Sequence, residues 1–349
     1  MKKLSLQKTN VAKDFLIIDK PLDLVNYKDG YSYFTTKQGD EIKGACCKCE
    51  ERYCAYYNEQ ELKDELFIQF PKNPSLRVCP TDAIKFDEKG VAYITANCIN
   101  CGLCLYRCPF AAIQYNPYNS TCSINHETDN SFVSCTNEKQ KLFVEGIKSL
   151  RKIVSFRPIT IEFTENYMKC LKTSVSLFSD ISEIIVRNTF LNLGVKCNVN
   201  AQGNNHIRIE FFAHVNENAV LGESEITNTD TLSVIRRILD DVAVLKSRYN
   251  FDINCIIPLS VINGLPNKRT DYYEVIKDVK NALGIQIYTL TYHILYMLHL
   301  YQIRLSKDIL CNFVIDNENT SLVEPTKIVI EGLSKKDCNL ATTNYIPTK

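Results

Sequence analysis

Apolar residues recur with a helical period in the C-terminal part of the chain. In TLSVIRRILDDVAVLKSRY, residues 231–249, apolar side chains return every three or four positions, which predicts an amphipathic helix. Residues 174–192 predict an earlier helix that ends at Gly194. DYYEVIKDVKNALG predicts a later helix, which its final glycine stops.

Apolar runs between these helices predict strands. VKCNVNAQGNNHIRIEFFAHV predicts a hairpin with a Gly-Asn turn, and AVLGESEIT predicts a third strand. INCIIPLSVI and IQIYTLT predict two further buried strands. The resulting order is α-β-β-β-α-β-α-β, which is typical of an α/β domain.

The N-terminal part of the chain has a different pattern. Residues 15–42 predict short strands with an Asp-Gly turn signal. Residues 117–138 are rich in Asn, Ser and Thr and lack apolar periodicity, which indicates a linker. Because 349 residues suffice for two domains, we expect one domain over 1–116, a linker over 117–138 and an α/β domain over 139–349.

One apolar stretch, residues 285–303, approaches the length that spans a membrane. It also contains histidine, glutamine, threonine and tyrosine, which favours a buried strand followed by a core helix. The first residues carry lysines but no apolar core of signal-peptide length. We therefore expect no membrane insertion.

The net charge and the cysteine content restrict the partners and the redox environment that we expect. The net charge is +1, which gives no global reason to expect a nucleic-acid or membrane partner, although a local basic patch is compatible with it. Sixteen cysteines in a chain of this length are not the signature of a short disulfide scaffold. Half of them have spacings that fit metal ligation. Such thiolates must stay reduced, which implies a cytoplasmic location.

The main chemical signal is a cysteine run that ends in Cys-Pro. Four cysteines form C-x2-C-x2-C-x3-C-P, namely Cys98, Cys101, Cys104 and Cys108. This spacing places three thiolates around one 4Fe–4S cluster and directs the fourth to another cluster. A structural zinc site needs only four thiolates and does not explain this spacing of the cysteines.

A second half-motif lies upstream. Cys46, Cys49 and Cys54 have the spacing C-x2-C-x4-C, and Cys79 supplies a second Cys-Pro. Crossed ligation then predicts two clusters. The first is held by Cys46, Cys49, Cys54 and Cys108, and the second by Cys79, Cys98, Cys101 and Cys104. Cys47 has the wrong spacing to Cys49, and we interpret it as a small buried residue beside the cluster.

On these motifs, residues 46–116 resemble the bacterial-type two-cluster ferredoxin domain. CxxCxxxxC and the ending CPFAAIQYN are most similar to the iron–sulfur electron-transfer subunits of the dimethyl-sulfoxide-reductase family. The resemblance covers about a fifth of the chain and implies an α+β ferredoxin-like fold. One departure is an insertion between Cys54 and Cys79, in which NEQELKDEL predicts a short helix. An insertion at a loop tip costs little chain entropy.

The α/β domain resembles the restriction-endonuclease-like PD-(D/E)XK fold in its order of elements. The resemblance implies that Glu210 is the first strand acid, Glu223 the glutamate of the next strand and Glu183 an outlying acid. Glu225 departs from the family, which has lysine there. The positive charge would then come from elsewhere, with Lys196, Lys246 and Arg208 as candidates.

Two functions remain open at this stage. In the first, Glu210 and Glu223 hold Mg²⁺ or Mn²⁺ for the cleavage of nucleic acid. In the second, the clusters transfer electrons and the α/β domain docks a redox partner. The strand acids also have a simpler reading as solvent-facing residues. Cys122, His126 and Cys135 in the linker fit no strong metal motif.

Overall fold

The computed structural model describes residues 46, 48–68, 75–108, 112–116, 121–124, 160–200, 208–227 and 230–330, and a few short stretches at 20–21, 34–36, 40–41, 70, 134–135, 154–156 and 333. The chain divides into two compact units. We call them the cysteine unit, Met1–Tyr57 with Arg77–Cys170, and the sheet unit, Asn58–Leu76 with Leu171–Lys349.

This division differs from the expected boundaries of 1–116, 117–138 and 139–349 in two places. The cysteine unit extends to Cys170, and residues 58–76 belong to the sheet unit although they interrupt the cysteine unit in sequence. The insertion between Cys54 and Cys79 is thus an element of the sheet unit. Most of residues 117–138 and much of 15–42 lie outside the described part of the chain.

The cysteine unit is built from short hairpins. Strands β5 (Ile84–Phe86) and β6 (Ala92–Ile94) pair antiparallel, as do β7 (Ile113–Asn116) and β8 (Thr121–Ile124). A single 3₁₀ turn, η2 (Leu105–Arg107), lies between the hairpins in sequence. With elements this short, the loops rather than the strands carry most of the cysteines.

Further strands of this unit are shorter. β4 (Lys48–Cys49) pairs in parallel with β9 (Ser134–Cys135). A small sheet has the order β1-β3-β2-β10. Its strands are Lys20–Pro21 (β1), Phe34–Thr36 (β2), Asp40–Glu41 (β3) and Val154–Phe156 (β10).

The sheet unit contains a mixed five-stranded sheet of order β11-β12-β13-β14-β15. The first three strands pair antiparallel and the last three in parallel. Their bounds are Lys196–Val199 (β11), Phe211–Val215 (β12), Asn218–Glu225 (β13), Ile256–Ile262 (β14) and Tyr288–Thr291 (β15). The central strands β13 and β14 are buried along nearly all their length, as expected for strands covered on both faces.

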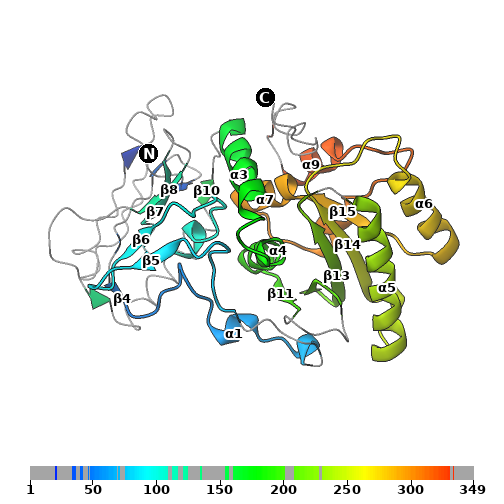
Figure 1. Ribbon diagram of the computed structural model, residues 1–349, viewed down its shortest axis with the longest axis horizontal. Helices are drawn as coiled ribbons and strands as arrows, with labels where there is room; N and C mark the ends of the chain where they lie inside the picture. The colour runs from blue at the N-terminus through cyan, green and yellow to red at the C-terminus, as the bar shows by residue number, and fades with distance from the viewer. Residues whose placement is uncertain are drawn as a thin grey trace. The chain divides into compact units, whose positions relative to one another are not determined.

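Helices cover both faces of this sheet. α4 (Ile181–Asn192) and α5 (Thr231–Tyr249) lie on opposite sides of β13 (Figure 1). α6 (Tyr272–Leu283) packs beside α5, and α7 (Tyr292–Leu300) packs beside α4. The remaining helices are α3 (Thr160–Ser174), α8 (Lys307–Cys311) and α9 (Val323–Val329).

Most of the predicted elements are present, in the order α4-β11-β12-β13-α5-β14-α6-β15. The helix predicted over 174–192 was misplaced at its start: α3 ends at Ser174, and α4 begins only at Ile181. Residues 285–303 form β15 and α7, as predicted. No helix in the described part of the chain combines the length and the apolar character needed to cross a membrane.

The insertion is anchored by aromatic packing within the sheet unit. It contains α1 (Glu59–Leu62), which a capping box at Asn58 begins, and the 3₁₀ turn η1 (Glu65–Phe67). The Phe70 ring lies 4.6 Å from Phe212 on β12 and 4.7 Å from Tyr249 at the end of α5. Lys196 on β11 donates to the carbonyls of Gln60 and Glu61. These contacts explain why the insertion belongs to the sheet unit.

Gly222 on β13 allows close packing at the centre of the sheet. A Cβ atom there would lie 2.1 Å from Cζ of Phe211 and 2.5 Å from the carbonyl oxygen of Leu259. Neither neighbour has room to move because both are fully buried. Because Gly222 has no side chain, the Phe211 ring of β12 and the Leu259 carbonyl of β14 can pack closely against β13, next to Glu223.

Candidate functional site

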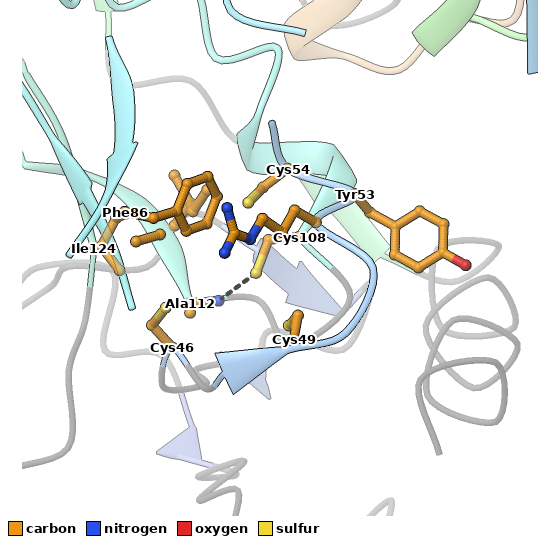
Figure 2. A pocket seen from close by; sticks show the side chains of 11 residues that line it. Cys46, Cys49, Tyr53, Cys54, Phe86, Cys108, Ala112 and Ile124 are labelled. Atoms are coloured by element: carbon orange, nitrogen blue, oxygen red, sulfur yellow. Dashed lines mark hydrogen bonds between the residues drawn. The ribbon is translucent and has the colours of Figure 1, made fainter. Parts of the chain in front are cut away.

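Four cysteines from two segments of the sequence line one cavity of the cysteine unit. Its cysteines are Cys46, Cys49, Cys54 and Cys108, the set predicted for the first cluster. Figure 2 shows their sulfur atoms around a common space, whereas the ring of Tyr53 points away. The cavity has about 410 Å³ of space free of protein atoms, part of it open to solvent. Cys108 is 54 residues or more from the other three in the sequence and joins them only through the fold.

Arginine and aromatic side chains complete this first cavity. The Arg52 guanidinium lies over the Phe86 ring, 3.9 Å from its centroid. Arg107, beside Cys108 in sequence, donates from Nε to the carbonyl of Tyr53 at 2.8 Å. Arg107 thereby holds the loop of Cys54 against the turn that carries Cys108.

A second cavity contains the other predicted set. Cys79, Cys98, Cys101 and Cys104 line it together with apolar side chains and a fifth cysteine, Cys122. It has about 310 Å³ of space free of protein atoms, again partly open. The left-handed backbone of Asn100 (φ 59°) and Gly102 (φ 71°) lets the chain curl around this space.

Backbone amides point at several of the sulfur atoms. The Ala83 N–H donates to Cys79 Sγ at 3.1 Å, and the Ala112 N–H donates to Cys108 Sγ at 3.3 Å (Figure 2). Both bonds run from the fourth residue after the cysteine of a Cys-Pro pair, so the two halves are built alike. Such bonds stabilise thiolates and influence the potential of a cluster bound to them.

Burial disfavours the thiolate form of the cysteines at the two cavities. Desolvation raises the pKa of Cys46 to about 11, and desolvation together with the neighbouring cysteines raises the pKa of Cys54 and Cys101 well above the ordinary value. Cys98 differs, because a hydrogen bond with the Cys122 side chain lowers its pKa to about 7. Buried thiols gathered in this way suit a cation that removes their protons.

The donor sets fit iron–sulfur ligation in number and chemistry. None of the nine cysteines at the two cavities forms a disulfide. The four predicted ligands at each cavity match a 4Fe–4S cluster in number, and the apolar walls provide the low polarity in which such clusters are held. Cys47 and His126 lie outside the described residues, and Cys135 is described only by its backbone pairing with Cys49.

Sequence reasoning missed the position of Cys122. It assigned this residue to a linker, whereas Cys122 lies on β8 and is buried at the second cavity. The signal that was available is the alternation in TCSI, which predicts a strand directly after the ferredoxin-like ending.

The sheet unit contains a separate cluster of carboxylates. Phe211 pairs with Gly222, and one further step of this antiparallel register places Glu210 opposite Glu223, on the same face. Glu210 Oε2 accepts from the N–H and the hydroxyl of Ser224, at 2.7 and 2.9 Å. Glu223 is 1% exposed.

Arg237 of α5 joins these two acids. Its Nε contacts Glu223 Oε2, and its Nη2 lies 3.8 Å from Glu210 Oε1. The candidates for the positive charge that were named from the sequence are Lys196, Lys246 and Arg208, and Arg237 is not among them. The Lys196 ammonium group instead donates to backbone carbonyls of the insertion. Arg237 is therefore the positive charge of this cluster.

The cluster has more carboxylates than cations. Burial, followed by the repulsion of neighbouring acids, raises the pKa of both Glu210 and Glu223 to about 8 and that of Asp241 to about 7. Glu183 contributes to the repulsion on Glu210. One guanidinium can neutralise one carboxylate, so the cluster retains protons at neutral pH.

The predicted acids thus lie in one cluster but make different contacts. Glu225 accepts from the backbone and hydroxyl of Thr227 and acts on Arg237 through its charge. In the described part of the chain, no three His, Cys, Asp or Glu side chains are arranged to hold a single metal ion. The Mg²⁺ expected at Glu210 and Glu223 remains a prediction.

Comparison with known families supports the cysteine sites. A family model described as the LdpA Fe-S cluster-binding domain matches residues 71–119. The match includes Cys79, Cys98, Cys101, Cys104 and Cys108. No curated protein and no solved structure matches the chain. The chain therefore contains an iron–sulfur cluster-binding domain.

Proposed function

We propose that the cysteine unit binds two 4Fe–4S clusters with crossed ligands. Cys46, Cys49, Cys54 and Cys108 hold the first, and Cys79, Cys98, Cys101 and Cys104 hold the second. The observation that carries this proposal is the division of eight cysteines into two cavities, in which each Cys-Pro cysteine lies with the three cysteines of the other half-motif. The bound clusters supply one-electron redox chemistry; the protein supplies thiolates, amide donors and apolar walls.

Electron transfer is the role best supported for such a pair. Cys104 of the second set is near enough to act electrostatically on Cys54 of the first set. Adjacent ligand sets give an electron a short path between the clusters. Reduced thiolates also fit the cytoplasmic location expected from the sequence. The sheet unit then docks a redox partner protein.

The test is the iron and sulfide content of protein purified without oxygen. Two clusters require about eight irons and eight labile sulfides per chain. Zinc without labile sulfide would reject the proposal, and four irons would leave only one of the two sites. Reduction by dithionite should bleach the visible absorbance if the clusters are redox-active.

A second candidate function belongs to the sheet unit. The mixed order α-β-β-β-α-β and the grouping of Glu183, Glu210 and Glu223 favour a restriction-endonuclease-like nuclease that acts on nucleic acid. Arg237 supplies the positive charge that Glu225 cannot. In this role Mg²⁺ or Mn²⁺ would bind Glu210 and Glu223 and activate water.

Cleavage of DNA and RNA substrates tests this candidate directly. Incubation with Mg²⁺ or Mn²⁺ should yield cleavage that Glu223→Gln abolishes while the iron content stays unchanged. Absence of cleavage with either metal, in protein with full iron content, would leave electron transfer as the function.

A further inference from the structure

Cys122 is a fifth thiol at a cavity whose other four cysteines suffice for a cluster. It is buried, and its side chain lines the same space as Cys79, Cys98, Cys101 and Cys104. Its thiol is within hydrogen-bonding reach of two of these, Cys98 and Cys104. A cysteine that only filled space in the core would not need to face ligand sulfur atoms.

The backbone holds Cys122 in this position. Cys122 pairs with Tyr115 across the β7–β8 hairpin. Its N–H donates to Asn100 Oδ1 at 2.7 Å, and the Cys98 thiol lies 3.6 Å from the same oxygen. The Asn100 side chain, which is fully buried, therefore ties the strand of Cys122 to the loop of Cys98. The Cys98 and Cys122 side chains therefore lie close together at one side of the cavity.

We propose that Cys122 is a reserve ligand of the second cluster, able to replace Cys98. This inference rests on the proposed function, because it requires a cluster at the second cavity. In the exchange, the iron–sulfur bond to Cys98 breaks and a bond to Cys122 forms. The proton released by the Cys122 thiol passes to the Cys98 sulfur. No electron is gained or lost, so no oxidant or reductant is needed.

Iron content and the spectrum of the reduced cluster test the exchange without relying on any activity. Alanine is the substitution of choice, since a serine oxygen can itself bind iron. Cys98→Ala should keep about eight irons per chain, with a changed electron paramagnetic resonance signal for one cluster. The double variant Cys98→Ala/Cys122→Ala should fall to about four irons, because no fourth thiolate remains at the second cavity.

Matched variants separate a reserve ligand from other roles. Cys122→Ala alone should keep the full iron content and the wild-type signal; loss of four irons would make Cys122 an obligatory ligand and overturn the proposal. Cys101→Ala should lose iron equally with and without Cys122, because the contacts of Cys122 run to Cys98 and Cys104. Equal iron loss in Cys98→Ala and in the double variant would also overturn it.

The iron content of the unmutated protein separates failure of the reserve role of Cys122 from failure of the proposed function. If the unmutated protein carries about eight irons and Cys98→Ala falls to four, only the reserve role of Cys122 fails. If the unmutated protein lacks a second cluster, the proposed function itself fails. Native mass spectrometry of the same samples gives the cluster number per chain independently of the chemical assays.

Discussion

Glu223 on β13 contacts the guanidinium of Arg237 on α5, within a group of carboxylates that this arginine alone cannot neutralise. Because burial raises the pKa of Glu210 and Glu223 to about 8, the folded state binds more protons than the unfolded chain between about pH 4.5 and pH 8. The stabilisation is complete below this range and is lost as the pH rises through it.

The sheet unit should therefore unfold more readily at pH 8 than at pH 5. Urea denaturation followed by circular dichroism measures the difference. Glu223→Gln, whose amide cannot ionise, should reduce the slope of stability with pH. Mg²⁺ should restore stability at pH 8 in the wild type and not in Glu223→Gln if the cluster binds metal. A stability that rises from pH 5 to pH 8 would contradict the protonated cluster.

Substitution of Gly222 should destabilise the sheet unit strongly. Gly222→Ala forces a methyl group against Phe211 and the Leu259 carbonyl, and overpacking of this kind costs about 1–3 kcal/mol or more. The matched control is Gly284→Ala, where nothing lies within 4 Å and only the positive φ of 70° is strained, at a cost of about 1–2 kcal/mol. Urea midpoints that shift equally in the two variants would argue against close packing at Gly222.

The insertion should stabilise the sheet unit rather than the first cluster. Phe70→Ala removes the ring that packs on Phe212 and Tyr249, and we expect a loss of about 3 kcal/mol in unfolding free energy. Ile68→Ala is the control, because Ile68 is 73% exposed and should change stability by less than about 0.5 kcal/mol. Both variants should keep the wild-type iron content. Iron loss in Phe70→Ala without loss of stability would assign the insertion to the cluster site.

Arg52 should raise the reduction potential of the first cluster. Its guanidinium lines that cavity, and a nearby positive charge favours the more negative, reduced form. Arg52→Gln should lower the potential of one cluster by tens of millivolts, on the order expected for a partly exposed charge, and leave the other unchanged. A potentiometric titration followed by electron paramagnetic resonance resolves the two. Equal shifts in both clusters would indicate a general change in the unit.

Much of the sheet unit was predictable because its elements are long and periodic. The helix predicted over 231–249 is α5, with the bounds Thr231–Tyr249, since a polar N-cap and an Asn250 in the left-handed region enclose the apolar stripe. The start of α4 was missed because apolar residues continue from α3 through the turn before Ile181. Periodicity does not register such a turn.

The grouping of the cysteines was predictable only where they follow one another in sequence. Cysteine spacing was enough to propose two sets, because neighbouring cysteines in a tight loop must face one cluster. The roles of Cys122, Arg237 and Asp241 depend on tertiary packing. Asp241 lies on the same helix as Arg237 and is 3% exposed beside Glu223. Side chains brought together from distant elements leave no local pattern in the sequence.

The crossed ligation of two clusters is the central claim, and one comparison tests it most directly. Cys104 and Cys108 are four residues apart, on one turn, yet they belong to different cavities. Electron paramagnetic resonance of the reduced protein should show that Cys108→Ala and Cys54→Ala lose the same cluster signal, and that Cys104→Ala loses the other. If Cys104→Ala and Cys108→Ala lost the same cluster signal while Cys54→Ala retained it, crossed ligation would be contradicted.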